Sequence, residues 1–84
     1  MELKIGDSWE GVTATITTEQ AEDLLGALSN GTDTSSNNPV SVTWIGSMDA
    51  DITYVEGGFE DYTQQYKGES LKELIKIIEN ELEG

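Results

Sequence analysis

Residues 40–54, VSVTWIGSMDADITY, decide the fold because two alternating segments flank a short turn sequence. Apolar side chains occupy every second position on both sides of that turn: Val40, Val42, Trp44, Ala50, Ile52 and Tyr54. A period of two is typical of a strand with one buried face. If Ile45 pairs with Asp49 across a three-residue loop, all six apolar side chains gather on one face. The stretch therefore predicts an antiparallel hairpin.

A second turn sequence, Glu56–Gly57–Gly58, follows the hairpin directly. If the apolar side chains of the two strands that flank this turn share one face of the sheet, Ile52 pairs with Tyr62. A third strand then runs to about Tyr66 and completes a three-stranded meander, with Glu60 at its solvated end.

Two segments have the helical period of about 3.6 residues. The first begins with the capping-box pair Thr17 and Gln20, carries an apolar stripe over residues 21–28, and stops at Asn30–Gly31. The second begins with the pair Ser70 and Glu73 and carries a longer apolar stripe: Leu71, Leu74, Ile75, Ile78 and Leu82. The pattern predicts two helices that each bury one face.

Two features of the second helix lie outside that stripe. Ile77 either widens the buried face or marks a contact surface. Glu79, Glu81 and Glu83 stand near the C-terminal end of the helix, where the helix dipole disfavours anions. Either the last turn frays or a basic partner covers it.

The N-terminal part adds one strand or a hairpin, because residues 2–5 and 11–17 also alternate. Residues 30–39 are polar, without periodicity, and end at Pro39, so we expect a flexible loop there. The whole pattern predicts one α+β domain over residues 1–84: a small antiparallel sheet with two helices on one face, in the order β(β)αβββα.

Charge and composition exclude several classes of function. The chain has 17 acidic and 4 basic residues, all four of them lysines, and a net charge of −13, with no histidine or cysteine. Structural zinc sites with thiolate or imidazole ligands, disulfides, cysteine nucleophiles and Ser-His-Asp catalysis are therefore excluded, and we expect no cofactor. Without arginine and with this charge, direct binding to nucleic acid or to anionic membranes is disfavoured. The expected partner is a basic protein.

The location of the protein is predicted from what the sequence lacks. Glu2 and Lys4 interrupt any apolar run near the N-terminus, and apolar runs such as Ile77–Ile78 are far too short to span a membrane. We therefore expect a cytoplasmic protein, in a bacterial host cell if the resemblance described below holds.

Asp49 and Asp51 are the candidates for carboxylate chemistry. At positions i and i+2 of a strand they point the same way, about 6.6 Å apart. Mg²⁺ and Ca²⁺ require carboxylates that converge in a concave site, and a flat exposed face offers none. We therefore expect no metal site, no catalytic residue and no enzymatic activity.

The same acids have a second interpretation, as a charged surface. On the exposed sheet face, the predicted pairing places Asp49 and Asp51 on one strand and Asp61 on its neighbour, with Thr53 and Thr63 between them. Glu56 and Glu60 lie at the adjoining turn. Carboxylates about 6 to 7 Å apart approximate the spacing of phosphates along a nucleic-acid strand, whose charge repeats once per roughly 3.4 Å of helix axis. The alternatives are a solvated face that keeps a small sheet soluble, or adaptation to high salt.

In size, charge and α+β layout, with acids such as Asp49, Asp51 and Asp61, the chain resembles the small acidic inhibitors of phages, the DNA-mimic anti-CRISPR and anti-restriction proteins. The resemblance covers properties of the whole chain and no motif. It implies an inhibitor that occupies the basic groove of a CRISPR effector or restriction-type nuclease. From the residues themselves we expect an exposed aromatic or aliphatic side chain, Tyr62, Tyr66 or Ile45, to add specific contacts.

Two other functions fit the same sequence. One is an immunity protein or antitoxin that neutralises a basic nuclease toxin. The other is an oligomerisation or scaffold domain without an electrostatic partner, in which Ile77 extends an apolar strip. We expect a monomer or a homodimer, and the sequence does not choose between them.

Overall fold

The computed structural model describes residues 1–6, 11–56 and 60–84, and of Glu56, Glu60 and Asp61 it describes the backbone alone. In these ranges the elements are β1 (Glu2–Ile5), β2 (Val12–Thr15), α1 (Thr18–Asn30), β3 (Val40–Gly46), β4 (Asp49–Glu56), β5 (Glu60–Lys67) and α2 (Glu69–Glu83). The strands form two antiparallel sheets, β1–β2 and β3–β4–β5. The predicted α+β class and element order are confirmed, with a hairpin at the N-terminus.

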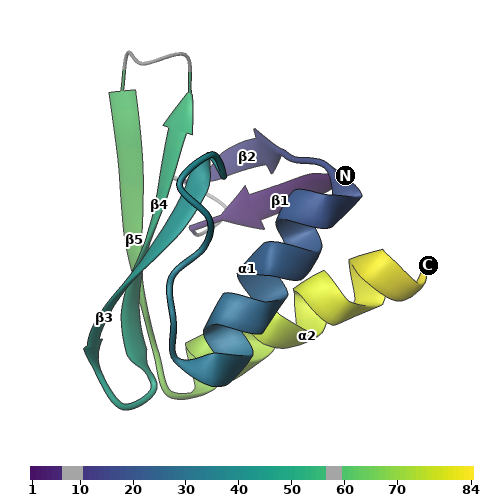
Figure 1. Ribbon diagram of the computed structural model, residues 1–84. Helices are drawn as coiled ribbons and strands as arrows, with labels where there is room; N and C mark the ends of the chain where they lie inside the picture. The colour runs from purple at the N-terminus through teal and green to yellow at the C-terminus, as the bar shows by residue number, and fades with distance from the viewer. Residues whose placement is uncertain (7–10, 57–59) are drawn as a thin grey trace.

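The core lies on one side of the three-stranded sheet. Figure 1 shows both helices and the β1–β2 hairpin on that side. The two helices and the strands β1 to β4 contribute buried side chains, among them Ile5, Leu24, Ile52 and Leu71, whereas the core-facing tyrosines of β5 are half-buried. The opposite side of the sheet has no described element over it, so one sheet face is left for contact with solvent or a partner.

The register of β3 against β4 follows the prediction except at the turn. Val42 lies opposite Ile52, as the apolar pattern requires. Asp49, however, pairs with Gly46, so the predicted pairing with Ile45 is wrong. A β-bulge at Ile45 adds one residue to β3, and a two-residue turn then keeps the apolar faces aligned.

The register of β4 against β5 differs from the prediction by two residues. Ile52 lies opposite Gln64, and Tyr62 lies opposite Tyr54. The predicted turn at Gly57–Gly58 falls outside the described residues. Because the shift is even, every side chain stays on its expected face while its cross-strand partner changes.

The ends of α1 are as predicted. The Gln20 N–H donates to Thr17 Oγ1 at 3.1 Å, and the Thr17 N–H donates to Gln20 Oε1 at 2.9 Å, which completes the capping box. At the other end Gly31 has φ +71°, a left-handed conformation that glycine adopts readily.

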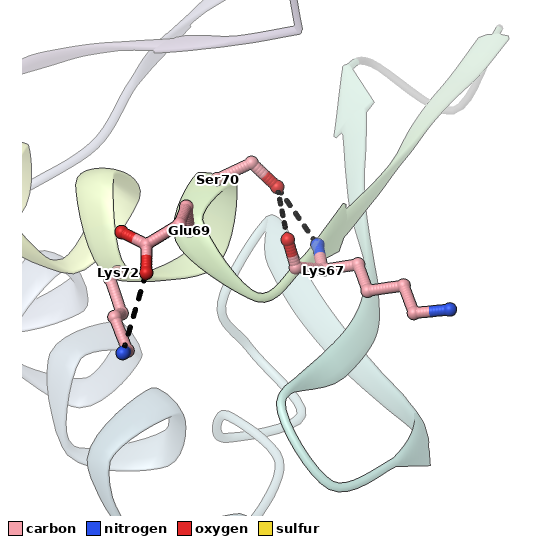
Figure 2. Close-up of polar contacts among 4 residues, drawn as sticks. All are labelled: Lys67, Glu69, Ser70 and Lys72. Atoms are coloured by element: carbon pink, nitrogen blue, oxygen red, sulfur yellow. Dashed lines mark hydrogen bonds and ion pairs between the residues drawn. The ribbon is translucent and has the colours of Figure 1, made fainter.

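The start of α2 differs from the prediction. The helix begins at Glu69, after Gly68, and no side chain caps it. Ser70 Oγ instead accepts from the Lys67 N–H at 2.8 Å and donates to the Lys67 C=O at 3.0 Å, as Figure 2 shows. The predicted capping box with Glu73 is therefore wrong, because the hydroxyl bonds to the end of β5. Ile77 is 49% exposed and does not widen the buried face.

The loop between α1 and β3 covers the outer edge of β3. Asp33 Oδ1 accepts from the Val42 N–H at 2.9 Å, and Thr34 Oγ1 donates to the Val40 C=O at 2.7 Å. The buried Asn38 accepts from the Val40 N–H at 3.0 Å through Oδ1. This loop, for which the sequence predicts flexibility, is thus fastened to the strand at three of its residues.

Candidate partner-binding surface

Asp49 and Asp51 lie on the uncovered face of the three-stranded sheet. Both are half-buried and alternate along β4 with the fully buried Ala50 and Ile52, so their side chains point away from the core. We call this surface the outer sheet face; its described members are Ser41, Thr43, Asp49, Asp51, Thr53, Val55, Thr63, Gln65 and Lys67.

The two carboxylates of the outer sheet face have polar neighbours on the adjacent strands. Gln65 Nε2 donates to Asp49 Oδ1 at 2.8 Å, and the hydroxyls of Thr53 and Thr63 lie 3.0 Å apart. Lys67 stands directly opposite Asp49 in the ladder. The two carboxylates therefore lie among amide, hydroxyl and ammonium groups, and the face is not continuously acidic.

The structure does not bring Asp61 to the other two acids. Asp51 lies opposite Gln65, and Asp61 lies four residues away along β5, opposite Val55. Four residues of strand correspond to about 13 Å. Glu56 and Glu60 pair with each other at that far end of the ladder. The side chains of Glu56, Glu60 and Asp61 fall outside the described part of the chain.

Tyr62 and Tyr66 lie on the core-facing side of β5, half-buried. The Tyr66 hydroxyl accepts a 2.8 Å hydrogen bond from the Gly6 N–H, and the Tyr62 hydroxyl donates to Gln64 Oε1 at 3.2 Å. Burial raises the pKa of Tyr66; the bond from Gly6 lowers this pKa and the neighbouring Tyr62 raises it, both to a smaller degree. Their contacts indicate that the two tyrosines join the β1–β2 hairpin to the sheet.

Gly6 occupies a position that only glycine fits. Its φ is +96°, and a Cβ there would lie 2.2 Å from the Tyr62 hydroxyl oxygen and 2.9 Å from the Gly11 Cα. The backbone directly after β1 therefore approaches the Tyr62 side chain of β5 more closely than a side chain at position 6 would permit. This joint between the hairpin and β5 depends on packing between distant segments, and no local pattern in the sequence indicates it.

Asp23 has a structural role that the sequence did not predict. Its Oδ2 accepts from the Ser35 N–H at 2.7 Å and from Asn38 Nδ2 at 3.1 Å. The bond from the Ser35 backbone, followed by that from the Asn38 side chain, lowers the pKa of Asp23. This carboxylate holds the α1–β3 loop against the helix.

Most of the negative charge on the described side chains is uncompensated. None of the acidic side chains that the structure describes is buried. Among the described side chains a single ion pair forms, between Lys72 Nζ and Glu69 Oε1 at 3.6 Å, as Figure 2 shows, and both side chains are well exposed. A pair of this kind contributes about 0 to 1 kcal/mol to stability. The carboxylates consequently present a strong negative potential to any approaching molecule.

These carboxylates are dispersed over the fold. Among the described residues no three come together in the manner of a metal site. No helix in that part of the chain is long and apolar enough to cross a membrane. The arrangement offers a broad charged surface for binding a molecule of opposite charge. Comparison with known proteins finds no family model, no curated protein and no solved structure that matches this chain.

Proposed function

We propose that this protein is an acidic inhibitor that binds a basic nucleic-acid-binding protein, such as a CRISPR effector or a restriction-type nuclease, in place of nucleic acid. The observation that carries the proposal is the net charge of −13, which is displayed on a folded surface with one exposed ion pair among the described residues. Self-repulsion of this size destabilises a compact chain, and solubility alone requires less charge.

Binding is non-covalent and stoichiometric in this proposal. Lysine and arginine side chains of the target attract the carboxylates, which accelerates encounter and makes the affinity fall as salt rises. Asp49 and Asp51 are proposed as one contact region, and Glu56, Glu60 and Asp61 as a second region at the far end of the β4–β5 ladder. Tyr62 and Tyr66 pack on the core side, so their proposed contribution is to hold the hairpin in place.

A capture experiment tests the proposal. The tagged protein is incubated with nuclease-treated bacterial lysate, washed at low salt and eluted with a salt gradient. The expected result is retention of one basic nucleic-acid enzyme that added DNA or RNA displaces. Retention of nothing, or of a protein indifferent to both salt and nucleic acid, would overturn the proposal.

Charge-reversal variants locate the contact. The double variant Asp49→Lys/Asp51→Lys changes the outer sheet face, and Glu2→Lys/Glu73→Lys makes the same change in net charge at exposed positions elsewhere. If the outer sheet face makes the contact, the first variant loses the target and the second retains it. Equal loss in both variants would mean that net charge alone drives retention.

The exposure of Ile77 favours one further candidate, an oligomerisation domain. This side chain is 49% exposed on α2 and lines a groove of about 390 Å³ beside Lys4, Tyr66 and Glu73. A second copy that covered Ile77 would bury apolar surface. Sedimentation at high protein concentration and high salt tests this candidate, because a monomer under those conditions excludes it.

A further inference from the structure

Gly26 lies in the middle of α1, where the backbone conformation does not require glycine. It does not have a positive φ, and a Cβ built at this position meets nothing within 4 Å. A glycine in a helix interior destabilises the helix relative to alanine. Neither backbone geometry nor packing within the described fold explains its presence, whereas close approach of another backbone would.

The space over Gly26 belongs to a groove between the two helices. Its lining residues are Thr18, Glu22, Leu25 and Gly26 of α1 and Leu82 of α2, and its volume is about 490 Å³. Figure 1 shows that the N-terminal half of α1 and the C-terminal half of α2 diverge from the point where the helices cross. The residues from Thr18 to Gly26 extend about 12 Å along α1, which is a little over two helical turns.

The lining combines an apolar part with one carboxylate. Leu25 and Leu82 are both half-buried, so each leaves part of its side chain open to the groove. Glu22 lines the groove from α1 and is exposed, and Glu79 and Glu83 are exposed on α2 within one turn of Leu82, outside the lining. An occupant that matches this lining has apolar side chains on one face and cations beside that face.

The C-terminal end of α2 adds a second reason for a basic occupant. The last turn holds acidic residues and no basic residue, although the helix dipole disfavours anions there. The carboxylate of Glu83 and the negative end of the helix dipole therefore add to one local negative potential. A cationic side chain placed against this end relieves a repulsion that the free chain carries.

We infer that the groove binds a basic amphipathic helix of the partner protein, with the backbone of that helix approaching Gly26. Packing of a helix into a groove between two others, with apolar residues at helical spacing, is a recurring mode of recognition. The inference rests on the proposed function in taking the partner to be basic. It adds the class of structure that is recognised and a contact site separate from the outer sheet face.

The test uses two synthetic peptides of identical leucine, lysine and alanine composition. In one the leucines recur at helical spacing over about three turns, and in the other they alternate as in a strand. Each is titrated into the isotopically labelled full chain, and backbone amide shifts are followed by NMR. We expect the helical peptide to shift the amides of Leu25, Gly26 and Leu82 and to bind more weakly as salt rises.

A pair of variants provides the control. Gly26→Leu fills the groove, and Asn80→Leu adds the same side chain at an exposed position of α2. Neither changes the net charge, and leucine is a good helix former, so both are expected to fold. Gly26→Leu should weaken the helical peptide about tenfold or more, whereas Asn80→Leu should leave its affinity unchanged.

Several results would overturn the inference. These are absence of binding, equal affinity for the two peptides, shifts confined to the outer sheet face, and a Gly26→Leu affinity equal to that of the wild type. Self-association of the free protein with shifts at the same amides would assign the groove to a second copy instead. If a DNA-displaceable enzyme is retained from lysate while the groove fails these tests, the proposed function survives and the helix-binding groove does not.

Discussion

The Gly6 N–H and the Tyr66 hydroxyl, sixty positions apart in the chain, are joined by a 2.8 Å hydrogen bond. This bond connects the end of β1 to β5 and so links the two sheets of the fold. It lies beside the joint in which Gly6 approaches the Tyr62 hydroxyl. The position of the N-terminal hairpin over the sheet therefore depends on two tyrosines of β5.

Tyr66→Phe removes this bond and leaves the ring. We expect a loss of about 1 kcal/mol in the free energy of unfolding, because the Gly6 N–H is left without its partner. Chemical denaturation measures the change. Tyr62→Phe is the control, since the Tyr62 hydroxyl bonds to a side chain at 3.2 Å and to no backbone group of β1. Equal losses in the two variants would contradict the special role of Tyr66.

The stability that the Tyr66 hydroxyl contributes should depend on pH in alkaline solution. Burial is the main cause that raises the pKa of Tyr66 above its ordinary value of about 10. A group whose pKa is raised by folding adds stability that is complete below the unfolded pKa and is lost as pH rises through the folded pKa. The stability difference between wild type and Tyr66→Phe should therefore shrink above about pH 10. A difference that stays constant there would contradict this expectation.

Two glycines of the α1 region should respond oppositely to alanine. Gly26 lacks a positive φ and has open space around it, so Gly26→Ala should raise the free energy of unfolding by about 0.5–1 kcal/mol. Gly31 has φ +71°, where a Cβ costs roughly 1–2 kcal/mol, so Gly31→Ala should lower it. Thermal or chemical denaturation of both variants gives the signs. A loss at Gly26 would show that the free protein itself requires glycine there.

Asp23→Ala should release the α1–β3 loop. It removes the acceptor for the Ser35 N–H and for the Asn38 amide, and we expect a loss of about 1 kcal/mol at neutral pH. Hydrogen bonds lower the pKa of this carboxyl in the folded protein. Its contribution is therefore present above the unfolded pKa and is lost as pH falls through the folded pKa. Denaturation of wild type and variant between neutral pH and about pH 2, below the ordinary Asp pKa of about 3.9, should show the two converging.

Salt should stabilise the folded chain. The net charge is −13, and the described residues contain one exposed ion pair, so screening removes more repulsion than attraction. A gain on the order of 1 kcal/mol would raise Tm by about 4–8 °C for a domain of this size. Scanning calorimetry in sodium chloride measures the shift, and chloride is preferred because sulfate also strengthens apolar burial. A Tm that falls with salt would mean that attractive pairs dominate.

The alternation of residues 40–54 was sufficient to predict the β3–β4 hairpin and its buried face. Together with the turn sequence that follows, it predicted a third strand but not the register of β5. A two-residue shift leaves each side chain on the same face, so both registers satisfy the same apolar pattern. The structure pairs Ile52 with Gln64 and moves Asp61 about 13 Å away from the partner of Asp51. The predicted acidic cluster depended on the part of the register that the pattern leaves undetermined.

The helix ends show the same limit of local reasoning. Thr17 and Gln20 form the predicted capping box because both partners lie within one turn of the chain. Ser70 has the same local signature, yet its hydroxyl bonds to Lys67 because β5 runs directly into α2. The sequence predicted Tyr66 as a contact residue. The local pattern could not indicate its half-burial, because that arises from a hairpin some sixty residues earlier in the chain.

The α1–β3 loop covers part of the outer edge of β3 and so limits where the three-stranded sheet can pair with a strand of another molecule. Asp33 and Thr34 already occupy hydrogen-bonding groups of Val42 and Val40, so a strand from another molecule finds few free partners there. Within the three-stranded sheet, the edge that remains more open to pairing between copies is therefore β5. A pair formed through β5 turns two partly covered β3 edges outward, so further growth through this sheet is disfavoured.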